Sequence, residues 1–201
     1  MGSRQMFQPL TREDIMTVVL YRIGIVLSAI IISGLAFLAA TVSSSFGAVS
    51  LSLSVNILVY GLYVSVGMSV FFIHLYIGKF HKFLKNLYYL GLGCLVALLF
   101  LGTGSLADAL AYAPYRALFL LPLSGCLGFV TAKEAFCFKL TEGYLLALIM
   151  PLYLLLVSSG LLTRVGASYG LVLIAVMLVV FTLRKVFMPL AYDIGDKSAY
   201  S

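Results

Sequence analysis

The feature that most limits the fold is a long uncharged stretch. Residues 23–78 contain no Asp, Glu, Lys or Arg. A transmembrane helix needs about 20 predominantly apolar residues, so this stretch is long enough for two. Ser and Gly cluster in its middle, in SSSFGAVSLS (residues 43–52), which predicts the break between the two helices.

The composition extends this conclusion to the whole chain. Of the 201 residues, 63% are hydrophobic and only 10% are charged, and the mean hydropathy is +1.13. A soluble domain carries about 25% charged residues, so lipid must be the solvent for most of these side chains. The formal net charge of +6 does not indicate nucleic-acid binding, because the basic residues stand singly at the ends of apolar runs.

Charged residues divide the chain into segments of spanning length. We therefore expect an all-α, polytopic membrane protein, a bundle of six transmembrane helices over residues 23–43, 54–78, 86–104, 115–134, 142–163 and 166–188. A polar, helical N-terminal segment (1–22) precedes this single transmembrane domain (23–190), and a polar tail (191–201) follows it. Thr11 can cap a helix that has Glu13 and Asp14 in its first turn. This helix could lie on the membrane surface or extend the first span, and we expect the extension because no polar break separates the two.

The distribution of Lys and Arg predicts the orientation. Eleven of the 13 basic residues belong to the side that holds both termini and the loops at 79–85 and 135–141. Cytoplasmic loops carry an excess of Lys and Arg, so we expect both termini on the cytosolic side, or the equivalent side in an organelle. The two on the other side are Arg116 and Arg164.

A charged stretch, GFVTAKEAFCFKLTEG (residues 128–143), is the main candidate site. The preceding uncharged run, residues 117–132, would make only about 24 Å of helix, short of the ~30 Å hydrocarbon core. The span must therefore take in charged residues at its ends, where Arg116 and Lys133 can extend to the interface. Glu134 is shorter, and we expect it at headgroup depth with a cationic partner. The candidates on the same membrane face are Lys79, Lys82 and Lys85.

Two interpretations of the stretch stay open. In the first, Glu134, Cys137 and Glu142 form a polar site at the cytosolic mouth of the bundle, since an intramembrane carboxylate suggests function. In the second, the stretch is an ordinary loop, with Thr141 capping the next helix and Glu142 at its positive end. Pro122 and Pro151 lie within expected spans and can act as hinges.

Two further features could bind ligands or partners. His74, near the cytosolic end of the expected second span, is a candidate chlorophyll ligand. KFHKFLK (residues 79–85) alternates cations with Phe80 and Phe83, a pattern that suits anionic lipid headgroups or an acidic partner.

Several enzyme classes find no support in the sequence. H-E-x-x-H and P-loop motifs are absent, and the three cysteines form no C-x-x-C pair. A membrane enzyme that uses Cys137 with Glu134 lacks a neighbouring histidine in the sequence to activate the thiol. We therefore expect a protein that is not an enzyme.

The string Gly128-Phe-Val-Thr-Ala-Lys-Glu-Ala-Phe-Cys-Phe138, followed by Glu142, resembles an uncharacterised family of integral membrane proteins of cyanobacteria and plastids. The resemblance covers nearly the whole chain in size and span number. It implies a thylakoid membrane, with both termini on the stromal or cytosolic face, and no established reaction.

The expected function is an accessory one. We expect a protein that binds other membrane proteins and assists assembly or stability of a photosystem, photosystem II being favoured. The partner contacts expected are Lys79, Lys82, Lys85, Lys133, Glu134, Lys139 and Glu142. Chlorophyll or carotenoid is a candidate cofactor. The alternative is a small transporter or channel in which Glu134 is the functional carboxylate.

Overall fold

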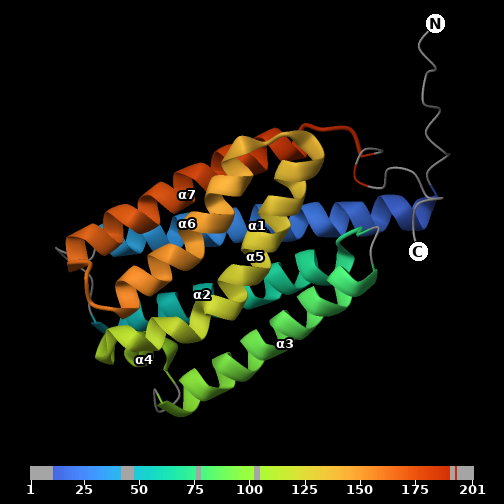
Figure 1. The fold of residues 1–201 in the computed structure, drawn as a ribbon. Coiled ribbons are helices and arrows are strands. Elements are labelled where there is room, and N and C mark those ends of the chain that lie inside the picture. The colour runs from blue at the N-terminus through green and yellow to red at the C-terminus, as the bar shows by residue number, and fades with distance from the viewer. Residues whose placement is uncertain (1–10, 42–47, 76–77, 102–104, 191–192, 194–201) are drawn as a thin grey trace, which may run out of the picture.

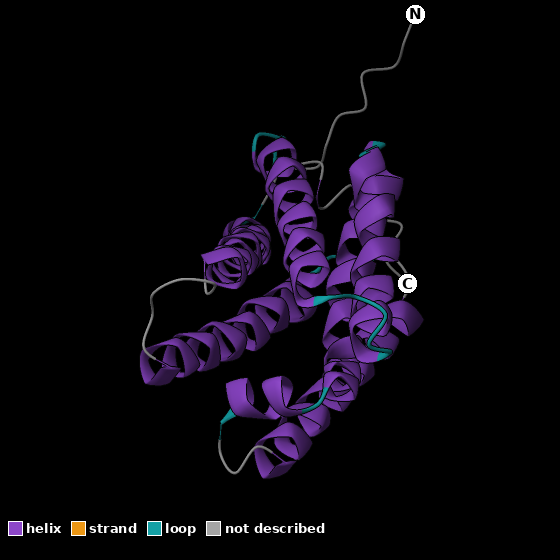
Figure 2. Ribbon diagram, turned by 90° about the vertical axis from the view of Figure 1, so that its left-hand side faces the viewer, coloured by secondary structure: helices purple, strands orange, loops and turns teal. Residues whose placement is uncertain are grey.

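The computed structural model describes residues 11–41, 48–75, 78–101, 105–190 and 193. Within them the chain is helical and has no strand (Figures 1 and 2). Six helices of this described part are long and apolar enough to cross a membrane, which confirms the predicted all-α architecture with six spans. The elements are α1 (Arg12–Thr41), α2 (Ala48–Phe72), α3 (Gly78–Leu101), α4 (Leu106–Tyr112), the 3₁₀ helix η1 (Pro114–Leu120), α5 (Leu121–Phe138), α6 (Thr141–Ser158) and α7 (Arg164–Val186).

The first helix begins where its capping residues predict. The Oγ1 of Thr11 accepts a hydrogen bond from the backbone N–H of Asp14 at 3.3 Å, and the Asp14 carboxylate accepts one from the Thr11 N–H at 2.9 Å. The helix then runs unbroken to Thr41, so the N-terminal helix does extend the first span. Residues 1–10 lie outside the described part of the chain.

The fourth span differs most from expectation. It begins as η1 and continues as α5, so together they cover Pro114–Phe138. A 3₁₀ helix rises about 2.0 Å per residue, more than an α-helix, which lengthens the span. Pro122 therefore stands in the first turn of α5, where proline is tolerated, while Pro151 does lie inside α6.

The predicted loop at 135–141 was wrong. α5 continues through Glu134 to Phe138, and only Lys139 and Leu140 separate it from α6. Lys139 has φ 56°, the left-handed conformation that ends the helix and reverses the chain. Thr141 is the first residue of α6 and not its cap, because Leu140 holds the cap position.

The helices pack around one apolar core. α1 lies against α2 and α7, and α5 lies against α6 and α3. Buried residues on α1 recur every three or four positions, which places them along one side of the helix: Val18, Tyr21, Ile25, Ala29, Ile32 and Ala36.

One end of the bundle collects most of the charge. α1 and α3 begin there, α7 ends there and the α5–α6 turn lies there, on the right in Figure 1. We call it the charged end. At the opposite end, Arg116 is buried and donates to the carbonyl oxygens of Leu101 and Ala109 at 3.3 and 3.2 Å. The sequence predicted that Arg116 extends to the membrane interface. In the structure it instead binds backbone carbonyls at the ends of neighbouring helices.

Candidate functional site: a buried charge cluster

Glu134 lies inside the bundle, with no exposed surface. Its Oε1 accepts a hydrogen bond from the Tyr21 hydroxyl at 2.7 Å and forms an ion pair with Lys133 Nζ at 2.8 Å. Its Oε2 forms an ion pair with Lys185 Nζ. The carboxylate thus joins α1, α5 and α7 at the charged end.

A second carboxylate completes the arrangement. Asp193, which follows the end of α7, accepts from Arg22 Nε at 2.7 Å through Oδ2 and pairs with Lys185 through Oδ1. Lys185 therefore bridges Asp193 and Glu134. We call Arg22, Lys133, Glu134, Lys185 and Asp193 the buried charge cluster.

The cluster contains three cations and two carboxylates. Removing charges from water costs several kcal/mol per ion, which only close pairing and further hydrogen bonds offset. Aromatic rings give additional stabilisation, since Lys185 Nζ lies 4.0 Å from the Phe138 ring centroid and Lys133 Nζ lies 5.6 Å from that of Tyr21. Because the cluster has fewer carboxylates than cations, each carboxylate pairs with two cations.

The expected partners of Glu134 were wrong. Its ion pairs are to Lys133 and Lys185 and not to the lysines of α3. Side chains of neighbouring residues on a helix point apart, but the long, flexible side chain of Lys133 reaches the adjacent carboxylate. Lys133 and Glu134 therefore contact their own chain, at a place where Glu134 offers no surface to a partner.

Sequence reasoning did not single out Tyr21, Arg22, Lys185 or Asp193. One signal was present for two of them: Arg22 and Lys185 each lie within or beside an apolar run, in VVLYRIGIV and VVFTLRKVFM. A cation in such a run needs a partner, and the carboxylates of the chain are few. Asp193 had no local signal, because its pairing with Arg22 joins residues 171 positions apart.

The other expected contact residues lie around the cluster. Lys79, Lys82 and Lys139 are exposed, while Lys85 Nζ lies 5.6 Å from the Phe71 ring centroid. Glu142 is in the first turn of α6 and forms a bidentate ion pair with Arg184 Nη1, at 2.6 and 2.8 Å. Cys137 is exposed near the end of α5.

His74 does not lie within the second span, because α2 ends at Phe72. It is part of the short connection to α3, and its Nε2 lies 3.3 Å from Thr17 Oγ1 on α1. Burial lowers the pKa of His74 below its usual value, and the positive charge of Lys133 lowers it further.

This shift predicts a pH dependence of stability. Below pH 6.5 the unfolded chain takes up a proton at His74 more readily than the folded chain does. The free energy of unfolding should therefore fall as the pH drops below about 6.5 toward the lower pKa of the folded state. Below that pKa, His74 is protonated in both states and causes no further loss. Thermal unfolding of the wild type and His74→Gln from pH 8 to 5 checks this, since the wild type should lose more stability. Parallel curves for the two proteins would contradict it.

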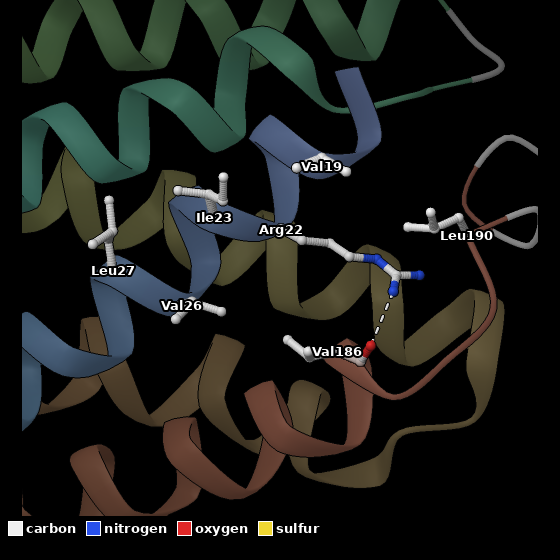
Figure 3. A pocket seen from close by; sticks show the side chains of 7 residues that line it. All are labelled: Val19, Arg22, Ile23, Val26, Leu27, Val186 and Leu190. Carbon is white, nitrogen blue, oxygen red and sulfur yellow. Dashed lines mark hydrogen bonds between the residues drawn. The ribbon is translucent and has the colours of Figure 1, made fainter. Parts of the chain in front are cut away.

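The two described grooves lie away from Glu134. One, of about 340 Å³, is lined mainly by apolar residues of α1, together with Val186 of α7, Leu190 and the Arg22 side chain (Figure 3). The other, of about 420 Å³, follows the same pair of helices toward the opposite end. Glu134 lines neither of them.

Comparison with known protein families identifies the family to which the chain belongs. A family model described as "Uncharacterized integral membrane protein (DUF2301)" matches residues 68–201, well over half of the sequence. The chain belongs to the DUF2301 family. The matched region contains Lys133, Glu134, Lys185 and Asp193, whereas Tyr21 and Arg22 precede it. No curated protein and no solved structure matches.

Proposed function

We propose that this integral membrane protein is a non-enzymatic accessory protein that binds other membrane proteins through its charged end. The observation that carries the proposal is the pairing of Glu134 with two lysines and a tyrosine. A coupling carboxylate in a transporter has to exchange protons or ions with water. Full pairing and burial favour instead a carboxylate that fixes helices in place, which weighs against the transporter alternative.

The proposed contact surface is a basic rim, which we define as Lys79, Phe80, Lys82, Phe83 and Lys139. All five side chains are exposed. The carboxylates of Glu134, Glu142 and Asp193 pair with other cations of the same end. None of the three rim lysines has an ion pair among the described residues. The rim therefore presents uncompensated positive charge beside aromatic rings, which suits an acidic partner surface.

The partner class and location that we propose follow from the family resemblance. They are a photosystem, with photosystem II favoured, and the thylakoid membrane of a cyanobacterium or plastid. The excess of Lys and Arg supports a charged end that faces the cytosol or stroma. His74 is the proposed chlorophyll ligand, and ligation through Nε2 would replace its contact with Thr17.

The test is affinity capture of the tagged protein from photosynthetic membranes in a mild detergent. We expect photosystem subunits to be enriched, and the double substitution Lys79→Glu with Lys82→Glu to lower their recovery roughly tenfold, the equivalent of about 1.4 kcal/mol. Recovery should also fall as salt is raised, because exposed charges are screened.

The matched control is Arg164→Glu. Arg164 is an exposed cation at the opposite end of the bundle, in the first turn of α7. Equal recovery of photosystem subunits with the rim variant and with Arg164→Glu would show that the basic rim is not the contact surface. A partner-free protein from such membranes would overturn the accessory function and favour flux assays on Glu134 variants.

A further inference from the structure

The groove between α1 and α7 that lies toward the opposite end, about 420 Å³ in volume, is apolar along its length. The residues that line it are Ser33, Ala36, Phe37, Ala40, Val172, Ala175, Val176, Val179 and Val180. The hydroxyl of Ser33 donates a hydrogen bond to the carbonyl of Ala29 at 2.7 Å, so this polar group is already bonded within its own helix. An apolar chain can therefore lie in the groove without burying an unbonded polar group.

Arg164 stands at the head of the row of α7 residues that lines this groove. Positions 164, 168, 172, 175 and 179 follow one another at spacings of three or four and therefore share one side of the helix. The Oγ of Ser168 donates to the carbonyl of Ala39 at 3.0 Å, which places Ser168 beside the end of the groove at Ala40. Arg164 lies one turn, or about 6 Å of helix, beyond Ser168. Its long side chain can therefore reach the mouth of the groove.

The length of α7 places Arg164 at the membrane surface. Arg184, which is exposed at the charged end, follows it by 20 positions on the same helix. At about 1.5 Å per residue this separation is roughly 30 Å, the thickness of the hydrocarbon core. Arg164 therefore lies at headgroup depth on the side of the membrane opposite the charged end.

The charge of Arg164 is exposed and has no ion pair among the described residues. The first turn of α7 contains no acidic residue, and the N-terminal end of a helix itself carries partial positive charge. The described acidic residue of this end is Asp108, on α4, which packs against α2, α3 and η1. The mouth of the groove therefore presents uncompensated positive charge at headgroup depth.

We infer that this groove binds an anionic glycerophospholipid, with the phosphate at Arg164 and an acyl chain along the groove. The charge complements the phosphate, and the apolar lining complements the chain. A transmembrane helix of another protein fits less well. The side chains of Phe37 and Val176, 65% and 57% exposed, hold a helix backbone away from the groove, whereas an acyl chain is thin and flexible.

The lipid site does not depend on the proposed docking function, because it lies at the end of the bundle opposite the basic rim. Arg164→Glu should lose the lipid and still recover photosystem subunits through the rim. Each proposal can therefore fail without the other.

The test is native mass spectrometry of the purified protein in detergent, titrated with phosphatidylglycerol or with phosphatidylcholine of the same acyl chains. We expect phosphatidylglycerol to bind at a saturable site, several-fold more tightly than phosphatidylcholine, because the choline cation is repelled by the positive mouth of the groove. Arg164→Gln should raise the dissociation constant for phosphatidylglycerol about tenfold, through loss of a charged hydrogen-bond donor. Arg12→Gln is the matched control, since Arg12 is an exposed cation in the first turn of α1 at the charged end. That control should leave the dissociation constant unchanged.

A second variant tests the groove itself. Ala40 is exposed and lines the groove, so Ala40→Phe fills the mouth without disturbing the core. It should weaken the binding of phosphatidylglycerol while Arg164 is still present. Leu173→Phe is the matched control, because Leu173 is 52% exposed on α7 and does not line the groove. It should bind phosphatidylglycerol as the wild type does.

Three outcomes would overturn the lipid site. The first is binding that does not saturate or does not distinguish phosphatidylglycerol from phosphatidylcholine, which is the behaviour of bulk lipid. The second is wild-type binding by both Arg164→Gln and Ala40→Phe. The third is loss of binding in Lys79→Glu with Lys82→Glu but not in Arg164→Gln, which would place the lipid on the basic rim.

Discussion

Glu134→Gln will destabilise the protein far more than Lys185→Met. Glutamine leaves Lys133 and Lys185 buried beside a neutral group, so that three cations share the single carboxylate of Asp193. Removal of one partner from a buried ion pair costs about 3–5 kcal/mol. Lys185→Met instead leaves two balanced pairs, Arg22 with Asp193 and Lys133 with Glu134, and places an apolar side chain over the Phe138 ring.

The measurement is thermal unfolding in detergent, followed with a thiol-reactive fluorophore. The chain has no Trp, but Cys126 is fully buried and reports the loss of the fold. Exposed Cys137 and half-buried Cys94 are replaced by serine in every variant, because both would react in the folded state. Glu142→Gln is the control for loss of a carboxylate at an exposed pair, which typically costs about 0–1 kcal/mol.

The double variant, Glu134→Gln with Lys185→Met, separates charge balance from shape. It removes one cation together with the carboxylate, so we expect it to be more stable than Glu134→Gln alone. A double variant whose loss equals the sum of the single losses would show that the two residues act independently. Our account of the cluster would then be wrong.

The spans were predictable because their signal is local. A run of apolar residues has to be satisfied by lipid wherever the rest of the chain lies, and residues 23–78 alone required two helices. The predicted start of the first helix also held, since Thr11 and Asp14 bond to each other across three positions.

The charged stretch was harder to predict because its meaning depends on distant residues. From the neighbouring residues alone, Lys133 and Glu134 are predicted to end a helix. In the structure, Tyr21 and Lys185 pair with Glu134, so α5 continues past it to Phe138. Tyr21 is 113 positions away along the chain. A sequence pattern over a few residues carries no information on such pairing.

Gly24→Ala will be the most damaging single-methyl substitution on α1, because α1 and α2 approach closely there. A Cβ at Gly24 would lie 2.4 Å from Ser69 Oγ and, more seriously, 2.7 Å from the backbone oxygen of Ser65 and 2.8 Å from the backbone nitrogen of Ser69. Backbone atoms cannot turn aside as a side chain does, so the helices have to separate. Overpacking of this kind costs about 1–3 kcal/mol.

The damage should reach the buried charge cluster, which gives the prediction a second readout. Separation of α1 from α2 stretches the Ser28–Ser65 hydrogen bond of 2.9 Å. It also shifts α1 at a point one turn from Tyr21, which donates a hydrogen bond to Glu134. Gly93→Ala is the matched control, because a Cβ there meets nothing within 4 Å. Alanine favours a helix over glycine by about 1 kcal/mol, so Gly93→Ala should raise the unfolding temperature slightly while Gly24→Ala lowers it. Equal shifts in the two variants would mean that the α1–α2 contact does not limit stability.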